Sequence, residues 1–159
     1  MSKLSGEYIA GFVDGEGCFA LKYRIDRQLN KNGVTREYRY WGAEFVIVLH
    51  PLDFKLLEMI RDTMGVGRIS YTKAGDQVRL SVQGIKELKN IVIPFFEKNS
   101  LMGIKSRDFL LWAQAIKIIA AHKGKTQRGR PNPVGTETQK ILEKLKTKID
   151  DLKRREVVV

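Results

Sequence analysis

Apolar and polar residues alternate along two long stretches in the first part of the chain. In the stretch from about residue 18 to 28, the apolar side chains, among them Phe19 and Leu21, occupy odd-numbered positions. In the stretch from about residue 36 to 49, the apolar residues Phe45 and Ile47 also follow every second position. Because successive side chains of a strand point to opposite faces, each stretch predicts a strand with one apolar and one more polar face.

Two shorter alternating runs and several runs with helical spacing complete the pattern. Residues 68–73 and 77–83 predict short strands joined by a turn at 74–76. Between Pro51 and Gly65 the apolar residues recur at helical spacing, and both boundary residues suit the ends of a helix. Further helices are expected at about 8–17, from about 85 to just before Pro94, at about 106–122, and at 136–152.

The resulting order of elements is αββαββα, followed by the helix at about 106–122 and an extra C-terminal helix at 136–152. It predicts an α+β fold with one four-stranded antiparallel sheet, whose apolar face is covered by helices. We expect residues 1–122 to form the core domain, residues 123–135 a basic loop, and residues 136–159 a C-terminal helix packed on the same domain.

Composition narrows the class of protein. The chain has 159 residues, 43% of them hydrophobic, which suffices for one domain with its own core. Its formal net charge of +11 indicates a polyanionic partner, with nucleic acid the leading candidate. The single cysteine, Cys18, excludes internal disulfides and is typical of a reducing compartment. No apolar run is long enough to cross a membrane, so we expect a soluble intracellular protein, in the cytoplasm or an organelle.

The chemically unusual stretch is the helix expected at about 8–17. It ends in two acids, Asp14 and Glu16, although the helix dipole already makes that end negative, and this placement favours a bound cation. Gly11 and Gly15 are four residues apart on one helical face, where small residues allow another backbone to approach closely. The alternative is an ordinary helix that ends in a glycine-rich turn.

Residues 9–17, with the sequence IAGFVDGEG, resemble the signature of the LAGLIDADG homing endonucleases. In that family two such helices pack side by side, and the sheet forms a curved saddle over double-stranded DNA. The resemblance implies that Glu16, at the eighth position of the motif, binds a catalytic divalent metal, Mg²⁺ or Mn²⁺. It also implies that the carbonyl of Gly15 helps to bind the metal and that Asp14 is mostly a structural group.

Two further catalytic candidates come from the same resemblance. The family carries a lysine just before its long helix, and Lys105 matches that position. It also has a polar residue, often Gln, at the end of the second strand. That position falls on Leu49, or on His50 if the alignment shifts by one residue. His50 and His122 are too far apart in sequence to predict a histidine-based site.

The chain contains one copy of the motif and no repeat of the αββαββα order. One motif supplies one metal-binding carboxylate, so we expect a homodimer that acts on a target with approximate twofold symmetry. The expected pairing surface of the two helices consists of Ala10, Gly11, Asp14 and Gly15.

The polar face of the sheet is the expected DNA-binding surface, because a two-stranded ribbon fits the major groove and Arg, Lys, Gln and Asn read base edges. By position, the DNA-facing residues are Lys22, Arg24, Asp26, Gln28, Tyr40, Glu44, Ser70, Thr72, Gln77, Arg79 and Ser81. The loop after the long helix adds Lys123, Lys125, Arg128 and Arg130, which are expected to contact phosphates.

Two other functions fit parts of the pattern. An RNA-splicing maturase of the same fold would have an idle nuclease site, and the presence of Glu16, Gly15 and Lys105 argues against it. A small basic RNA-binding protein of ribosomal type would expose aromatic residues on its sheet for base stacking, whereas Phe19 and Phe45 fall on the apolar face. The sequence therefore favours a metal-dependent, site-specific endonuclease of double-stranded DNA.

Overall fold

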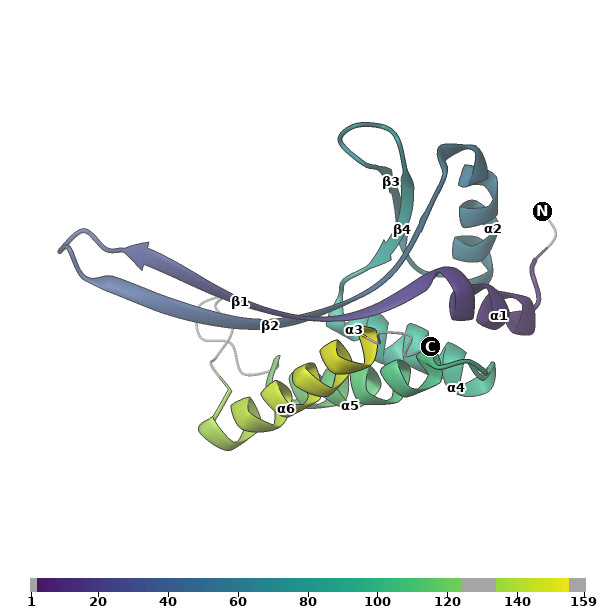
Figure 1. Ribbon diagram of the computed structural model, residues 1–159. Helices are drawn as coiled ribbons and strands as arrows, with labels where there is room; N and C mark the ends of the chain where they lie inside the picture. The colour runs from purple at the N-terminus through teal and green to yellow at the C-terminus, as the bar shows by residue number, and fades with distance from the viewer. Residues whose placement is uncertain (1–2, 124–133, 155–159) are drawn as a thin grey trace.

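The computed structural model describes residues 3–123 and 134–154, and it has the α+β fold that the sequence predicts. Helices and strands begin in the expected αββαββ order, and four α-helices follow the fourth strand in the described part of the chain (Figure 1). Their bounds are α1 Gly6–Glu16, β1 Gly17–Leu29, β2 Thr35–Leu49, α2 Phe54–Met64, β3 Arg68–Tyr71, β4 Val78–Val82, α3 Ile85–Glu87, α4 Ile93–Lys98, α5 Lys105–Lys123 and α6 Thr136–Lys153.

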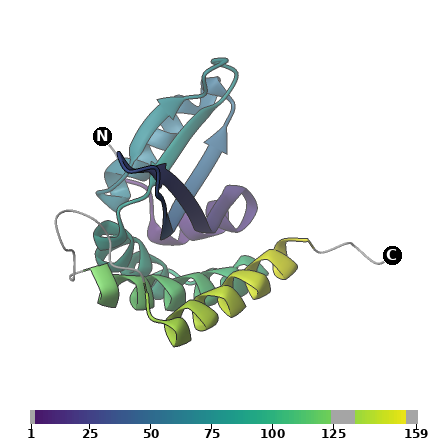
Figure 2. The same ribbon diagram turned by 90° about the vertical axis from the view of Figure 1, so that its left-hand side faces the viewer.

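The four strands form one antiparallel sheet in the order β1-β2-β4-β3. Pairing aligns Phe19 with Phe45 and Phe45 with Val82, so the apolar positions of three strands fall on one face. The sheet is strongly curved, and the β1–β2 hairpin extends far beyond β3 and β4 (Figure 1). Helices α5 and α6 lie under the convex face, whereas none of the described helices covers the concave face (Figures 1 and 2).

Aromatic rings join the convex face of the sheet to helix α5. The ring centroid of Phe19 lies 4.9 Å from that of Trp112 and 5.4 Å from that of Phe45, and all three side chains are buried. The indole Nε1 of Trp112 donates a hydrogen bond of 3.0 Å to the carbonyl of Ala20 in β1. Because a buried indole N–H needs an acceptor, this bond fixes α5 against the strand that follows α1.

Helix α6 packs on the same core. Its residues Leu142, Leu145 and Ile149 are at most 5% exposed. Near its start, Oε1 of Gln139 accepts a hydrogen bond of 2.7 Å from Nε1 of Trp41 in β2. Near its end, Nζ of Lys153 donates a hydrogen bond of 2.6 Å to the carbonyl of Phe19 in β1. Helix α6 therefore supports both strands of the long hairpin from the convex side.

One helical segment differs from the prediction. The sequence predicts a helix that ends before Pro94, but helical structure continues from α3 through a π-helical turn at Leu88–Val92 into α4. Pro94 lies in the first turn of α4, where a missing N–H breaks no required hydrogen bond. The proline therefore interrupts the bonding pattern without ending the segment. Like every helix in the described segments, this one is too short or too polar to cross a membrane.

Candidate functional site

Helix α1 is fixed at both of its ends. At the start, Oγ of Ser5 accepts a hydrogen bond of 3.1 Å from the amide of Tyr8. At the other end Gly17 begins β1, and a Cβ atom there would lie 2.5 Å from Cγ1 of Val13. This close approach requires glycine, because any side chain would collide with Val13. The sharp change from helix to strand leaves Glu16 exposed as the last residue of α1.

Asp14 is bonded to the loop that precedes α5. Its two carboxylate oxygens accept hydrogen bonds from the amides of Met102 (2.8 Å) and Gly103 (3.1 Å). Bonds from backbone amides to a carboxylate are charge-assisted and strong. They hold the loop against the C-terminal end of α1. Since the loop leads into Lys105, the first residue of α5, Asp14 also controls where that lysine lies.

Lys105 places its charge at the C-terminal end of α1. Its Nζ donates hydrogen bonds to the carbonyl of Gly15 at 2.9 Å and to that of Val13 at 3.3 Å. An ammonium group is favourable there because the helix dipole makes this end negative. The fold thereby brings Lys105 to the end of α1 that carries Gly15 and Glu16, although 90 positions separate Lys105 from Gly15.

A cleft of about 610 Å³ opens beside the same end of α1. The cleft is lined by polar residues and by the two candidates for the position at the end of β2. These lining residues are Glu16, Leu49, His50, Asp53, Asp76 and Gln77. Both candidates for the polar position at the end of β2, Leu49 and His50, therefore share a cleft with Glu16. Nδ1 of His50 accepts a hydrogen bond of 3.2 Å from the amide of Leu52, so the neutral ring carries its proton on Nε2.

The oxygens at this end of α1 suit a hard divalent cation. Carboxylate and carbonyl oxygens, as in Glu16 and Gly15, are the ligands that Mg²⁺ prefers, and Mg²⁺ commonly shares substrate phosphates with one or two carboxylates. The Gly15 carbonyl already accepts a hydrogen bond from a cation, the Lys105 ammonium. Among the described residues, no group of three His, Cys, Asp or Glu side chains could hold a metal alone. The described residues of one chain therefore offer only part of the ligand set that a divalent cation needs.

The sheet residues expected to face DNA share the concave face. Register places Arg24 opposite Tyr40, and Ser70 opposite Arg79, so these side chains project to the same side. The Arg24 side chain is 70% exposed, and its guanidinium lies 5.2 Å from the centre of the Tyr40 ring. The same register adds Lys22, Asp26, Gln28, Glu44 and Ser81, while Thr72 and Gln77 flank the β3–β4 turn, joined by a backbone hydrogen bond of 3.0 Å.

Glu44 differs from its neighbours on this face because it is buried, with 3% of its surface exposed. Its carboxylate accepts hydrogen bonds from Lys22, Arg79 (2.8 Å), Ser81 (2.6 Å) and Gln83 (3.0 Å). This burial corrects the expectation that Glu44 contacts DNA, because the carboxylate lies beneath its partners. Burial alone would raise the pKa of this carboxyl, but hydrogen bonds from Lys22, Ser81 and Gln83, together with the Lys22 charge, lower its pKa to about 2.

We expect acid to destabilise the fold through Glu44. Its folded-state pKa of about 2 lies below the ordinary value of 4.5, so the folded state binds fewer protons than the unfolded state. The resulting stability is present above about pH 4.5 and is lost as the pH falls toward 2, by about 3 kcal/mol in total. Urea unfolding at a series of pH values across this window measures the loss. Glu44→Gln should lose less stability than the parent over the window, and equal losses would contradict the assignment.

Sequence reasoning missed four polar residues that lie on the concave face or bind Glu44. These are Arg36, Tyr38, Arg68 and Gln83. Each continues the alternation of a neighbour that was included: Arg68, for example, precedes Ser70 by two positions and pairs with Ser81. Extending the alternation to the ends of the strands finds all four.

Two of the residues expected at a helix-pairing surface are occupied within the chain. Ala10 is 3% exposed and belongs to the hydrophobic core, and Asp14 is bonded to the loop before α5. Both therefore lie on the side of α1 that faces its own fold. This corrects the expected pairing surface, because the helix presents a different set of residues to solvent.

The exposed side of α1 is a stripe of two glycines and two aromatic residues. A Cβ atom added at Gly11 or Gly15 would meet no atom within 4 Å. Tyr8, which is 48% exposed, stacks on Phe12 with a centroid distance of 6.4 Å. Tyr8, Gly11, Phe12 and Gly15 are spaced so that they line one helical face, which we call the α1 stripe. Apolar rings beside bare backbone form a surface suited to packing.

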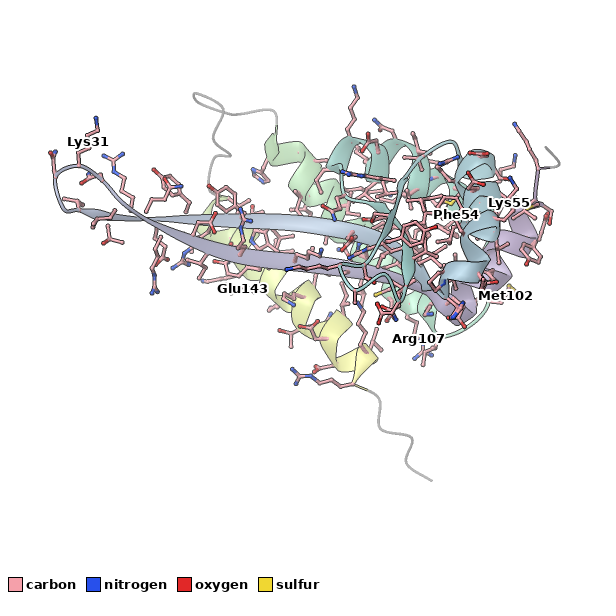
Figure 3. The ribbon with its side chains drawn as sticks, turned by 90° about the horizontal axis from the view of Figure 1, so that it is seen from above. Lys31, Phe54, Lys55, Met102, Arg107 and Glu143 are labelled. Carbon is pink, nitrogen blue, oxygen red and sulfur yellow. The ribbon has the colours of Figure 1, made fainter. Side chains whose placement is uncertain are left out.

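The remaining basic candidates lie at the edge of the described structure or outside it. Lys123 is the last residue of α5, and Lys125, Arg128 and Arg130 lie outside the described residues, so their phosphate contacts stay a prediction. Figure 3, which views the molecule from above, shows Lys31 at the tip of the long hairpin, at the opposite end from Met102. Positive charge thus extends along the hairpin far from the end of α1.

The profile of the LAGLIDADG endonuclease family matches residues 9–116. An uncharacterised 50.9 kDa protein in ND4 intron 1 of Podospora anserina is 36% identical over 122 residues, which cover 75% of this chain and 25% of that protein. Probable intron-encoded endonuclease 3 of Neurospora crassa is 32% identical over 107 residues, which cover 67% of this chain and 19% of that protein. The chain thus spans a quarter or less of the length of these two relatives.

Solved structures share the fold. The I-LtrWI LAGLIDADG homing endonuclease bound to target DNA matches with a TM-score of 0.73 and 26% identity, over 93% of this chain and 45% of that chain. The homing endonuclease I-TnaI matches with a TM-score of 0.72 and 25% identity, over 96% of each chain. I-SmaMI, bound to an uncleaved DNA target in the presence of calcium ions, matches with a TM-score of 0.72 and 25% identity, over 94% and 46%. These likenesses confirm the predicted homing-endonuclease fold.

Proposed function

The chain belongs to the LAGLIDADG endonuclease family, and from this membership we propose that it is a site-specific endonuclease of double-stranded DNA. It hydrolyses phosphodiester bonds, with Mg²⁺ or Mn²⁺, at a long and nearly twofold-symmetric target. The observation that carries the proposal is the meeting of Gly15, Glu16 and Lys105 at one end of α1. The DNA in the I-LtrWI structure and the calcium ions with I-SmaMI support the proposed ligands.

Each group at the end of α1 has a proposed part in hydrolysis. The Glu16 carboxylate and the Gly15 carbonyl would hold the cation, which when bound activates water and stabilises the leaving oxygen. Lys105 adds a positive charge where negative charge develops on the phosphate. The concave face orients the duplex, with Arg24 and Arg79 as candidates for bidentate contacts to guanine.

A complete site is proposed to need two copies of this fold, here a homodimer with one Glu16 from each chain. The stripe formed by Tyr8, Gly11, Phe12 and Gly15 is the proposed contact between the copies. Its open backbone lets a second helix approach closely. The lengths of the solved relatives support this proposal. I-TnaI, which aligns along 96% of its length, is a chain of about this size, whereas I-LtrWI, which aligns along 45% of its length, is about twice as long.

Gly11→Leu is expected to separate the copies without unfolding the chain. Leucine favours a helix over glycine by roughly 0.5–1 kcal/mol, and its Cβ meets no atom within 4 Å, so each protomer keeps its stability. The bulk would still block a second helix. The melting temperature of the parent should rise with protein concentration, and that of Gly11→Leu should not.

The control for Gly11→Leu is Gly135→Leu, at a second open glycine that lies before α6. It should associate like the parent in sedimentation velocity experiments at micromolar concentration. If Gly11→Leu associates as strongly as the parent, the α1 stripe is not the interface between the copies. If the parent is monomeric and still cuts DNA fully, the homodimer proposal is wrong.

The decisive experiment on function uses the DNA that flanks this gene. A duplex that joins the two flanking sequences directly, without the gene between them, should be cut on both strands in Mg²⁺. The flanking sequences with the gene inserted between them should not be cut. In Ca²⁺ we expect binding to the uninterrupted duplex and little cutting. If the parent binds its junction but never cuts it in Mg²⁺ or Mn²⁺, the endonuclease proposal fails and the maturase takes its place.

A further inference from the structure

Four polar side chains converge on the buried Glu44 carboxylate at the centre of the concave face. Lys22 reaches it from β1, Arg79 and Ser81 reach it from β4, and Gln83 reaches it from just beyond β4. The Glu44 side chain is 4% exposed, whereas those of Lys22 and Arg79 are 55% and 36% exposed. The acid is therefore covered by side chains that themselves face solvent.

The stability that the ionised Glu44 carboxylate adds above about pH 4.5 does not by itself explain why an acid occupies this place, and neither does DNA affinity. A buried ion pair is weak evidence for stability, because apolar residues of similar size often serve as well or better. A negative charge beneath a DNA-binding surface also opposes the attraction of phosphates. What Glu44 does provide is geometry, since its two oxygens fix two long cationic side chains relative to each other.

One of the two fixed cationic side chains, Arg79, lines an open hollow. A cavity of about 500 Å³ lies next to Glu44 and is lined by Arg68, Ser70, Arg79, Ser81 and Gln83, among others. The contact with Glu44 occupies one of the two terminal nitrogens of Arg79, so the guanidinium keeps donors for an external acceptor. Nε of Arg79 is buried and has no hydrogen-bond partner among the described residues. This burial further restricts the orientation of the guanidinium.

Resting on the DNA-cleaving function proposed above, we propose that Glu44 is a positioning residue that sets base preference. It holds Lys22 and Arg79 in one orientation, so that they read base edges, and it does not touch DNA itself. Long cationic side chains have many rotamers, so a mobile one can shift to contact a wrong base, whereas one held in a single orientation cannot. Ordering them beforehand lets the fit to the correct base decide the outcome.

Selection from a randomised duplex library tests this with three proteins: the parent, Glu44→Gln and Glu37→Gln. Glu37 is a matched control, because it lies on β2, pairs with Arg39 and Arg27, and projects to the opposite face of the sheet. Both variants remove one negative charge. Glu44→Gln should lose about tenfold in preference at one or two adjacent base pairs, with unchanged or tighter binding to random DNA. Glu37→Gln should keep the preference of the parent.

A double-mutant cycle separates positioning from a general loss of structure. In an Arg79→Ala background, Glu44→Gln should change the preference at the Arg79-dependent base pair little or not at all. If Glu44→Gln lowers the melting temperature but keeps the full preference at every position, Glu44 is only structural and the proposal is overturned. A uniform loss of affinity with unchanged preference overturns it as well.

A measurement without DNA keeps this proposal distinguishable from a failure of the proposed function. In NMR spectra of the parent, the Nε–H signal of Arg79 should exchange slowly with water, and that of Arg24, with a 70% exposed side chain, should exchange fast. Glu44→Gln should speed exchange at Arg79 toward the rate at Arg24, while Glu37→Gln should not. Fast exchange at Arg79 in the parent would show that the side chain is not held, and it would overturn the proposal whatever the protein does to DNA.

Discussion

Glu16→Gln is expected to reduce DNA cleavage on the order of 10³-fold and to leave DNA binding nearly unchanged. Glutamine keeps the shape of the side chain but removes the charge, so it is a poor ligand for a divalent cation. Glu16 is exposed and ends α1, so the substitution disturbs no packing. Binding without metal should be equal or tighter, since less negative charge then faces the phosphates.

The matched control is Glu7→Gln, which removes an exposed acid from the first turn of the same helix. It should cut and bind like the parent. A gel shift and a cleavage time course on one duplex, in Mg²⁺ and then in Ca²⁺, compare the three proteins. Cleavage by Glu16→Gln at close to the parental rate would mean that the cation is held elsewhere, and the proposed site would fail.

Glu16→Gln also has a consequence that needs no DNA. Two Glu16 carboxylates brought together in the proposed dimer repel each other, so a cation that binds there stabilises the folded protein. At a Mg²⁺ concentration of about 100 times the dissociation constant, the gain is about 2.7 kcal/mol. The parent and Glu7→Gln should show this Mg²⁺-dependent rise in melting temperature, and Glu16→Gln should not.

The fold could be predicted from the sequence because the strand period of two residues and the helical period of about 3.6 residues are both clear along the chain. Alternation over residues 18–28 and 36–49 predicts β1 and β2, and their register puts Phe19 beside Phe45 as the apolar face requires. The one clear failure, Pro94, arises because a proline is equally suited to ending one helical segment and to starting another. Only the preceding turn, which is π-helical, decides between them.

The site was harder to predict than the fold, because alternation gives the direction of a side chain and not its depth. Alternation along β2 places Glu44 on the concave face, but the strands on both sides of β2 bring hydrogen-bond donors over it and bury it. Ala10 is a small residue next to Gly11 and yet faces the core, because the helix turns it away from the exposed stripe. Such differences depend on neighbours distant in sequence, which no local pattern contains.

For Lys105, in contrast, a short sequence pattern does identify the residue. Only the fold shows which groups its ammonium contacts. Its position at the start of the long helix follows from the resemblance, but its proposed function depends on two long-range contacts. Asp14 bonds the loop amides, and Lys105 then reaches the carbonyls of Gly15 and Val13. The lysine therefore neutralises the end of the helix that carries the proposed metal ligands.

Lys105→Met is accordingly expected to lower cleavage on the order of 10²-fold or more while the protein stays folded. Methionine keeps an unbranched apolar stem and removes the charge. The loss of a cation at a helix end costs about 0.3–1 kcal/mol of stability, up to about 2 when partly buried. A folded domain with about 5–15 kcal/mol of stability stays almost fully folded after such a loss, so unfolding cannot account for a hundredfold fall in rate.

Two further variants separate the charge of Lys105 from its place. Lys117→Met, on the same helix, removes an exposed lysine paired with Glu97 and should cut like the parent. Lys105→Arg keeps the charge but carries a planar guanidinium where the structure fits a compact ammonium between two carbonyls, so it should restore only part of the rate. The measurement is single-turnover cleavage at saturating protein, which removes differences in DNA affinity. Equal rates for Lys105→Met and Lys117→Met would show that the ammonium only caps α1, and hydrolysis would then depend on Glu16 without it.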